Sequence, residues 1–123
     1  MIYMADKIIF VIETGRENMA KLMANIGMAT KMKEYEKNMK IEMIFLTPAV
    51  SVLNKDQALY RPILDTVWKA KNTGIKIIAC ETAMSNVGLT REKIPENLVD
   101  EFAPIGGIYV LNKIKEDYET FWI

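Results

Sequence analysis

The chain alternates between continuously apolar segments and segments in which apolar positions are spaced. Residues 7–13, 39–46 and 75–80 are largely apolar and rich in β-branched side chains, which is typical of strands covered on both faces. Over residues 18–37 and 61–71, apolar side chains recur every three or four positions between charged ones, which predicts amphipathic helices. This alternation of strand and helix predicts a parallel sheet with helices on both faces.

Turn residues predict where the helices begin. Thr14 and Glu17 have the spacing of a capping box and Gly15 permits a tight turn, so a helix is expected to start there. Thr47 and Pro48 predict a second start, with the threonine as cap and the proline at the first helical position.

The remaining elements are shorter. Residues 49–53 and 82–86 suit short helices, and residues 98–103 read as a strand weakened by two acidic side chains. Residues 108–115 are expected to be a helix despite their β-branched content, and residues 118–123 a terminal strand. With no internal repeat or linker, the 123 residues are interpreted as a single α/β domain with about five strands.

Charge and hydropathy exclude several classes of partner. Lys plus Arg equals Asp plus Glu, so net charge gives no reason to expect nucleic acid or an acidic membrane surface. No apolar run approaches the roughly 20 residues of a membrane helix, and residues 1–6 lack the pattern of a signal peptide. A cytoplasmic location is therefore expected, with no membrane partner.

The chain has no histidine and one cysteine, Cys80. The lack of histidine excludes Ser-His-Asp and Cys-His catalysis within one chain and argues against a zinc or other transition-metal site. A single cysteine forms no internal disulfide, which fits a reducing compartment. Neither a metal nor a cofactor is expected.

Cys80 ends the apolar run 75–80 and precedes a polar, helix-starting turn. Ligands gather at the carboxyl ends of strands in open α/β sheets, and a helix N-terminus favours the reactive thiolate. The hydroxyls of Thr82 and Ser85 could donate to the sulfur or to a bound oxyanion, whereas Glu81 would oppose the thiolate unless it points away. The alternative is that Cys80 is a small buried hydrophobe that closes a core strand.

A nucleotide- or flavin-binding domain is a third interpretation. Thr14 and Gly15 are only loosely similar to a phosphate-cradling turn, and the chain has neither a G-x-G-x-x-G motif nor a Walker lysine. This interpretation predicts a bound chromophore or phosphate at the strand ends.

The strand 76–80 followed by Ser85, Gly88, Leu89 and Glu92 resembles the cysteine stretch of the DsrE/DsrF family of sulfur-relay proteins and their peroxiredoxin-like relatives. The order of the other strands and helices is similar along nearly the whole chain, although those features are shared with many α/β domains. The absence of a second, resolving cysteine argues against peroxidase activity.

The resemblance implies a three-layer α/β/α sandwich with a mostly parallel sheet, assembled as a homo-oligomer, either a trimer or a hexamer. It implies that Cys80 carries sulfane sulfur, as a persulfide or thiosulfonate, between donor and acceptor proteins. Thr14, Gly15, Thr82 and Ser85 would line the substrate pocket. Whether such a chain is a sulfurtransferase enzyme or a carrier stays open, and the rival interpretation is a non-catalytic oligomeric module for small-ligand binding or assembly with a structural cysteine.

Overall fold

Five strands form one sheet in the computed structural model, which describes residues 6–123. The strands are β1 (Lys7–Ile12), β2 (Lys40–Phe45), β3 (Lys76–Cys80), β4 (Glu101–Ala103) and β5 (Glu119–Trp122). Their order is β4-β3-β2-β1-β5, and all four neighbouring pairs are parallel. All carboxyl ends of the strands therefore lie at one edge of the sheet. Residues 1–5, part of the segment in which the sequence shows no signal peptide, lie outside the described residues.

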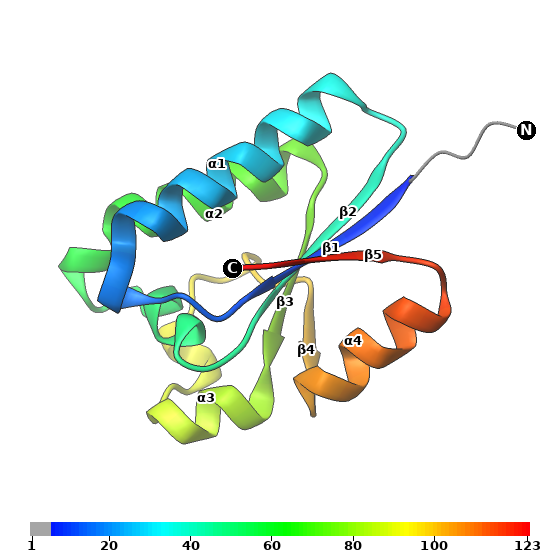
Figure 1. The fold of residues 1–123 in the computed structure, drawn as a ribbon. Helices are drawn as coiled ribbons and strands as arrows, with labels where there is room; N and C mark the ends of the chain where they lie inside the picture. The colour runs from blue at the N-terminus through cyan, green and yellow to red at the C-terminus, as the bar shows by residue number, and fades with distance from the viewer. Residues whose placement is uncertain (1–5) are drawn as a thin grey trace, which may run out of the picture.

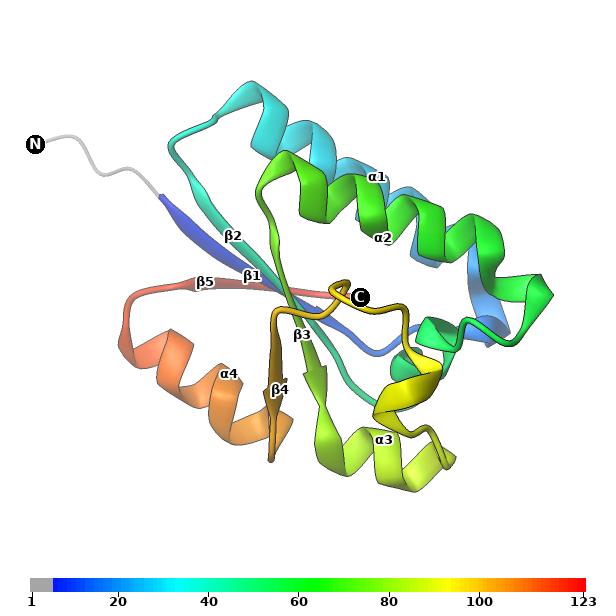
Figure 2. The ribbon, with the colours of Figure 1, turned by 180° about the vertical axis from the view of Figure 1, so that it is seen from behind.

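Within residues 6–123, four α-helices complete three layers, whose arrangement is seen in Figures 1 and 2. Helices α1 (Met19–Tyr35) and α2 (Arg61–Thr73) lie side by side on one face of the sheet, and α4 (Gly106–Lys115) covers the opposite face. The short helix α3 (Glu81–Val87) lies beyond the carboxyl end of β3. The expected parallel α/β sandwich is confirmed.

The two faces of the sheet are covered unequally. The face under α1 and α2 holds the larger core, which includes Phe10, Leu22, Phe45 and Ile63. On the other face, a small cluster of strand side chains meets α4 through Val110. Because apolar burial scales with area, α4 is held by a smaller hydrophobic contribution than the two helices opposite.

The predicted helix starts need correction. The chain first forms a 3-10 turn over Arg16–Asn18, and the cap of α1 is Asn18, whose Oδ1 accepts the Lys21 N–H at 3.1 Å. Thr14 is not the cap, and the Glu17 carboxylate accepts the Gly15 N–H instead. Similarly, Pro48 is the residue before a 3-10 helix over Ala49–Leu53 and not its first residue.

Strand β4 is shorter than the predicted range 98–103, and the two acidic residues at its start have specific partners. Asp100 Oδ2 accepts the Ile77 N–H at 2.8 Å, and Oδ1 pairs with Lys71 at 2.5 Å. Glu101 pairs with Lys76 at 2.7 Å. These contacts satisfy the two carboxylates at the start of an edge strand whose ladder extends over Glu101–Ala103. The helix predicted over residues 108–115 is present and begins two residues earlier.

Among residues 6–123, no helix combines the length and the apolar character needed to cross a bilayer.

Candidate functional site

Cys80 is the last residue of β3, opposite Ala103 of β4. The chain leaves these two neighbouring strands toward opposite faces of the sheet. After β3, the residues Ala83 and Met84 of α3 join the core on the α1 and α2 side, whereas after β4 the chain enters α4 on the other side. In open α/β sheets, ligands bind at the carboxyl ends of strands whose following segments diverge in this way. Cys80 lies at such a strand end.

The sulfur of Cys80 accepts hydrogen bonds from two helix N-termini. As the N-cap residue of α3, it receives the Ala83 N–H at 3.4 Å. It also receives the Gly106 N–H, from the first residue of α4, at 3.2 Å. Backbone N–H groups at helix N-termini carry partial positive charge, which stabilises negative charge on sulfur. Two independent elements thus direct donors at one thiol.

Gly106 permits this close approach because it has no side chain. A Cβ added there would lie 3.1 Å from Cys80 Sγ and 3.2 Å from Cys80 Cβ, and it would overlap Leu46 Cδ2 at the end of β2. Any larger residue would push α4 away from the sulfur. Cys80 itself is buried, with 5% of its surface exposed.

The two residues after Cys80 both point to other partners. The Glu81 carboxylate pairs with Arg91 at 2.6 Å, and Arg91 stacks over the ring of Phe102. The Glu81 carboxylate is therefore paired with a cation and, within residues 6–123, is not a hydrogen-bond partner of the Cys80 sulfur. The Thr82 hydroxyl donates to the Pro104 carbonyl at 2.7 Å, and the Thr82 N–H contacts the same oxygen at 3.3 Å. Thr82 therefore connects the starts of α3 and α4.

The other residues expected in the pocket lie further from the sulfur. Ser85 is on the exposed side of α3, where its carbonyl accepts the Gly88 N–H at the helix end. Thr14 and Gly15 follow β1, which is separated from β3 by β2. Gly15 packs on the loop after β2. A Cβ added at Gly15 would lie 3.1 Å from the Pro48 carbonyl oxygen. All these residues share the carboxyl edge, and within residues 6–123 the hydrogen bonds to the sulfur come from Ala83 and Gly106.

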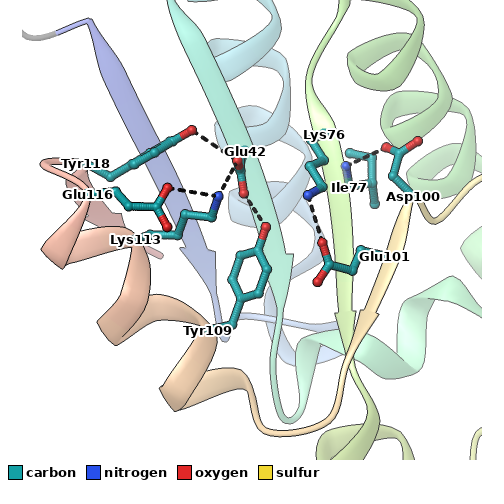
Figure 3. A network of polar contacts seen from close by, with 9 residues as sticks. All are labelled: Glu42, Lys76, Ile77, Asp100, Glu101, Tyr109, Lys113, Glu116 and Tyr118. Carbon is teal, nitrogen blue, oxygen red and sulfur yellow. Dashed lines mark hydrogen bonds and ion pairs between the residues drawn. The ribbon is translucent and has the colours of Figure 1, made fainter.

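Sequence analysis missed a buried polar network beneath α4 (Figure 3). Glu42 of β2 is 6% exposed and receives a short hydrogen bond from the Tyr109 hydroxyl of α4. Its second oxygen accepts the Tyr118 hydroxyl at 3.1 Å and pairs with Lys113 at 3.0 Å. Lys113 in turn lies 3.7 Å from Glu116. The carboxylate is therefore fully partnered despite its burial.

The network also raises the pKa values of its tyrosines. Burial, followed by the Glu42 carboxylate, raises the pKa of Tyr109 well above its ordinary value and that of Tyr118 to about 12. Both hydroxyls hence stay protonated at neutral pH and donate to the carboxylate. The sequence signal for this network was Glu42, a charged residue between apolar neighbours in a strand. Such a residue needs buried partners.

No three His, Cys, Asp or Glu side chains converge into a metal-binding arrangement within the described part of the chain.

The structure thus defines a class, a small parallel α/β domain whose one thiol lies between two helix N-termini. Residues 6–123 match the family model of the DsrE/DsrF-like family. The chain belongs to the DsrE/DsrF-like family.

Solved structures show the same fold in distant relatives. A Methanobacterium thermoautotrophicum protein of unknown function, MTH1491, has a TM-score of 0.75 at 17% identity, with 95% of this chain and 98% of that chain covered. The Escherichia coli ychN protein also has a TM-score of 0.75, at 14% identity, with 96% and 99% covered. A Bacteroides thetaiotaomicron protein of unknown function, BT1422, has a TM-score of 0.72 at 20% identity, with 99% and 100% covered. A comparison with curated proteins gives no significant match.

Proposed function

We propose that the protein is a sulfur carrier or sulfurtransferase in which Cys80 holds sulfane sulfur and passes it to a partner protein. The observation that carries the proposal is the pair of backbone donors, Ala83 N–H and Gly106 N–H, directed at one thiol at the carboxyl edge of the sheet. A thiolate is the nucleophile in sulfur exchange, and helix N-termini favour it. Membership of the DsrE/DsrF-like family supports the same chemistry.

The transfer is an exchange without net oxidation. The Cys80 thiolate attacks the terminal sulfur of a donor persulfide, a new S–S bond forms, and the donor's own S–S bond breaks to release a donor thiolate. With tetrathionate, the same attack leaves a thiosulfonate on Cys80 and releases thiosulfate. The two N–H donors that contact the thiol also suit the negative charge of the bound sulfur.

The surroundings of Cys80 assign roles to the neighbouring residues. Because the sulfur is buried, we propose that a donor reaches it between the starts of α3 and α4, next to the hydrogen bond from Thr82 to the Pro104 carbonyl. We assign Thr82 to the lining next to the thiol, and Ser85, Thr14 and Gly15 to the outer part of the same edge. The reaction is placed in the cytoplasm, where thiols stay reduced.

We further propose that the chain acts as a homo-oligomer, a trimer or a hexamer. Four aliphatic residues along the outer side of α4 are about half exposed, namely Ile105, Ile108, Leu111 and Ile114. Exposed aliphatic residues gathered on one short segment are typical of a protein interface.

The test of the carrier is the intact mass of the protein after incubation with polysulfide, thiosulfate or tetrathionate, with a Cys80→Ser variant as control. We expect a mass increase of one sulfur atom, or of a thiosulfonate group, that reductant removes and that the variant does not show. Absence of any adduct under all three conditions would refute the proposal.

A second candidate is a binding or assembly module in which Cys80 is structural, and the burial of the sulfur favours it. In that case Cys80→Ser would leave oligomeric state and cellular phenotype unchanged. If the protein is a carrier, the same variant should lose the protein's function in cells while the oligomer persists.

A further inference from the structure

The Gly106 N–H donor moves with α4, so the position of α4 determines one of the two hydrogen bonds to the Cys80 sulfur. Apolar packing fixes this helix weakly. Val110 is its one fully buried side chain in the core under α4, with Tyr109 partly buried against the same core, while Ile108, Leu111 and Ile114 are about half exposed. A polar contact adds to this packing.

That contact is the network around Glu42 (Figure 3). Tyr109 and Lys113 lie one turn apart on the inner side of α4, and both contact the Glu42 carboxylate. Tyr118 adds a third contact from the segment after the helix, so α4 is attached at its middle and its end. Lys113 also lies over the rings of Tyr109 and Tyr118, at 5.3 and 4.9 Å from their centroids.

The network acts at a distance from the thiol. Glu42 is opposite Lys76 in the sheet, and Cys80 lies four residues further along the same strand, which corresponds to about 13 Å. The helix spans this gap, with Gly106 at one end and Lys113 near the other. A tilt or rotation of α4 that displaces Gly106 by about a few tenths of an ångström would lengthen the hydrogen bond to sulfur.

We infer that Glu42 is a positioning residue for Cys80: by anchoring Tyr109 and Lys113, it holds α4 so that the Gly106 N–H stays on the sulfur. The inference concerns the reactivity of the thiol on which the proposed sulfur transfer rests. Glu42 makes no contact with substrate in this scheme. Its carboxylate acts on the thiol only by fixing the position of α4.

The experiment compares wild type with Glu42→Gln and Tyr109→Phe, two variants that keep side-chain volume and weaken the anchor. One readout is the rate of Cys80 alkylation by iodoacetamide at neutral pH, followed by intact mass. Loss of one hydrogen bond to the thiolate should slow this rate by about three- to tenfold in Glu42→Gln and by less in Tyr109→Phe. The second readout is the amide resonance of Gly106 in nitrogen-15 NMR spectra. We expect it to shift in both variants, and to shift more than the amide of Ala83, because α3 is held in the core on the other face of the sheet.

The control is Ile26→Val, which loosens the core on the opposite face of the sheet without touching α4. It should change neither the alkylation rate nor the Gly106 resonance. The inference is overturned if the folded variants alkylate as fast as wild type, if the Gly106 amide is unmoved, or if Ile26→Val has the same effects. Should Glu42→Gln fail to fold, Tyr109→Phe decides by the same criteria. Sulfur uptake is measured separately: wild-type protein that takes up no sulfur but shows the Glu42 dependence would refute the proposed function alone.

Discussion

Replacement of Gly106 with alanine tests the contact between α4 and the thiol directly. The new Cβ would lie 3.1 and 3.2 Å from Sγ and Cβ of Cys80, closer than the about 3.5–4.0 Å of an ordinary contact, and it would overlap Leu46 Cδ2. Leu46 can rotate away, but Cys80 Cβ is fixed to the strand, so α4 itself must move. The structure therefore predicts two linked effects, lower stability and slower reaction of Cys80.

The size of the stability effect follows from the packing. Overpacking a filled site costs typically about 1–3 kcal/mol, and alanine recovers part of this because it favours helix more than glycine does. Gly107→Ala is the matched control, since a Cβ there meets nothing within 4 Å and the two residues are neighbours in the first turn of α4. The difference between the two variants isolates the steric contribution, so Gly106→Ala should be less stable than Gly107→Ala by about 1–3 kcal/mol.

Urea unfolding of both variants measures this difference, and iodoacetamide alkylation measures the thiol. We expect Cys80 to react several times more slowly in Gly106→Ala and at the wild-type rate in Gly107→Ala, because only the first displaces an N–H donor. Equal stabilities of the two variants would refute the close packing. A normal alkylation rate in an overpacked, less stable Gly106→Ala would show that the α4 donor does not influence the sulfur.

Three further changes test the remaining contacts. Glu42→Ala leaves Lys113 and two hydroxyls buried without their carboxylate, so urea unfolding should show a loss of about 3–5 kcal/mol, and a loss below about 1 kcal/mol would contradict a buried pair. The pKa of Tyr118 is raised to about 12, so its contribution to stability is complete below its ordinary pKa of 10.0 and is lost as pH rises through about 12. The stability difference between wild type and Tyr118→Phe should therefore shrink over that range, whereas a constant difference would argue against the raised pKa. Leu111→Glu on the exposed side of α4 should lower the molar mass measured by light scattering from that of a trimer or hexamer, and an unchanged oligomer would place the interface elsewhere.

Local patterns were sufficient to predict most of the fold. Strands β1, β2 and β3 lie in largely apolar runs, so their ends differ from the predicted ranges by at most one residue. The position of Cys80 between a strand and a helix start followed from the same pattern. Helix caps were predicted less well, because Thr14 and Asn18 are both residue types that cap helices and the local sequence does not choose between them.

Contacts between distant segments were beyond such patterns. Gly106 is 26 residues from Cys80, and nothing in its own neighbourhood indicates that its N–H meets the sulfur. Thr82 was expected as a donor to the sulfur or to a bound oxyanion, yet in the structure its hydroxyl donates to the Pro104 carbonyl. Both details depend on how α4 returns to the edge of the sheet, a three-dimensional property that a local spacing of residues does not contain.

Helix α4 shows why the network around Glu42 escaped prediction. Its aliphatic residues Ile108, Leu111 and Ile114 face outward, while Tyr109 and Lys113 face the sheet, the reverse of an ordinary surface helix. A buried carboxylate on β2 makes this orientation favourable from the inside, because the inward side chains satisfy its charge. Burial of the outward residues in an oligomer would favour the same orientation from the outside. The two proposals for α4 therefore support each other: the interface would hold the helix in the rotation that keeps its first N–H on Cys80, so weakening either contact should slow the reaction of the thiol.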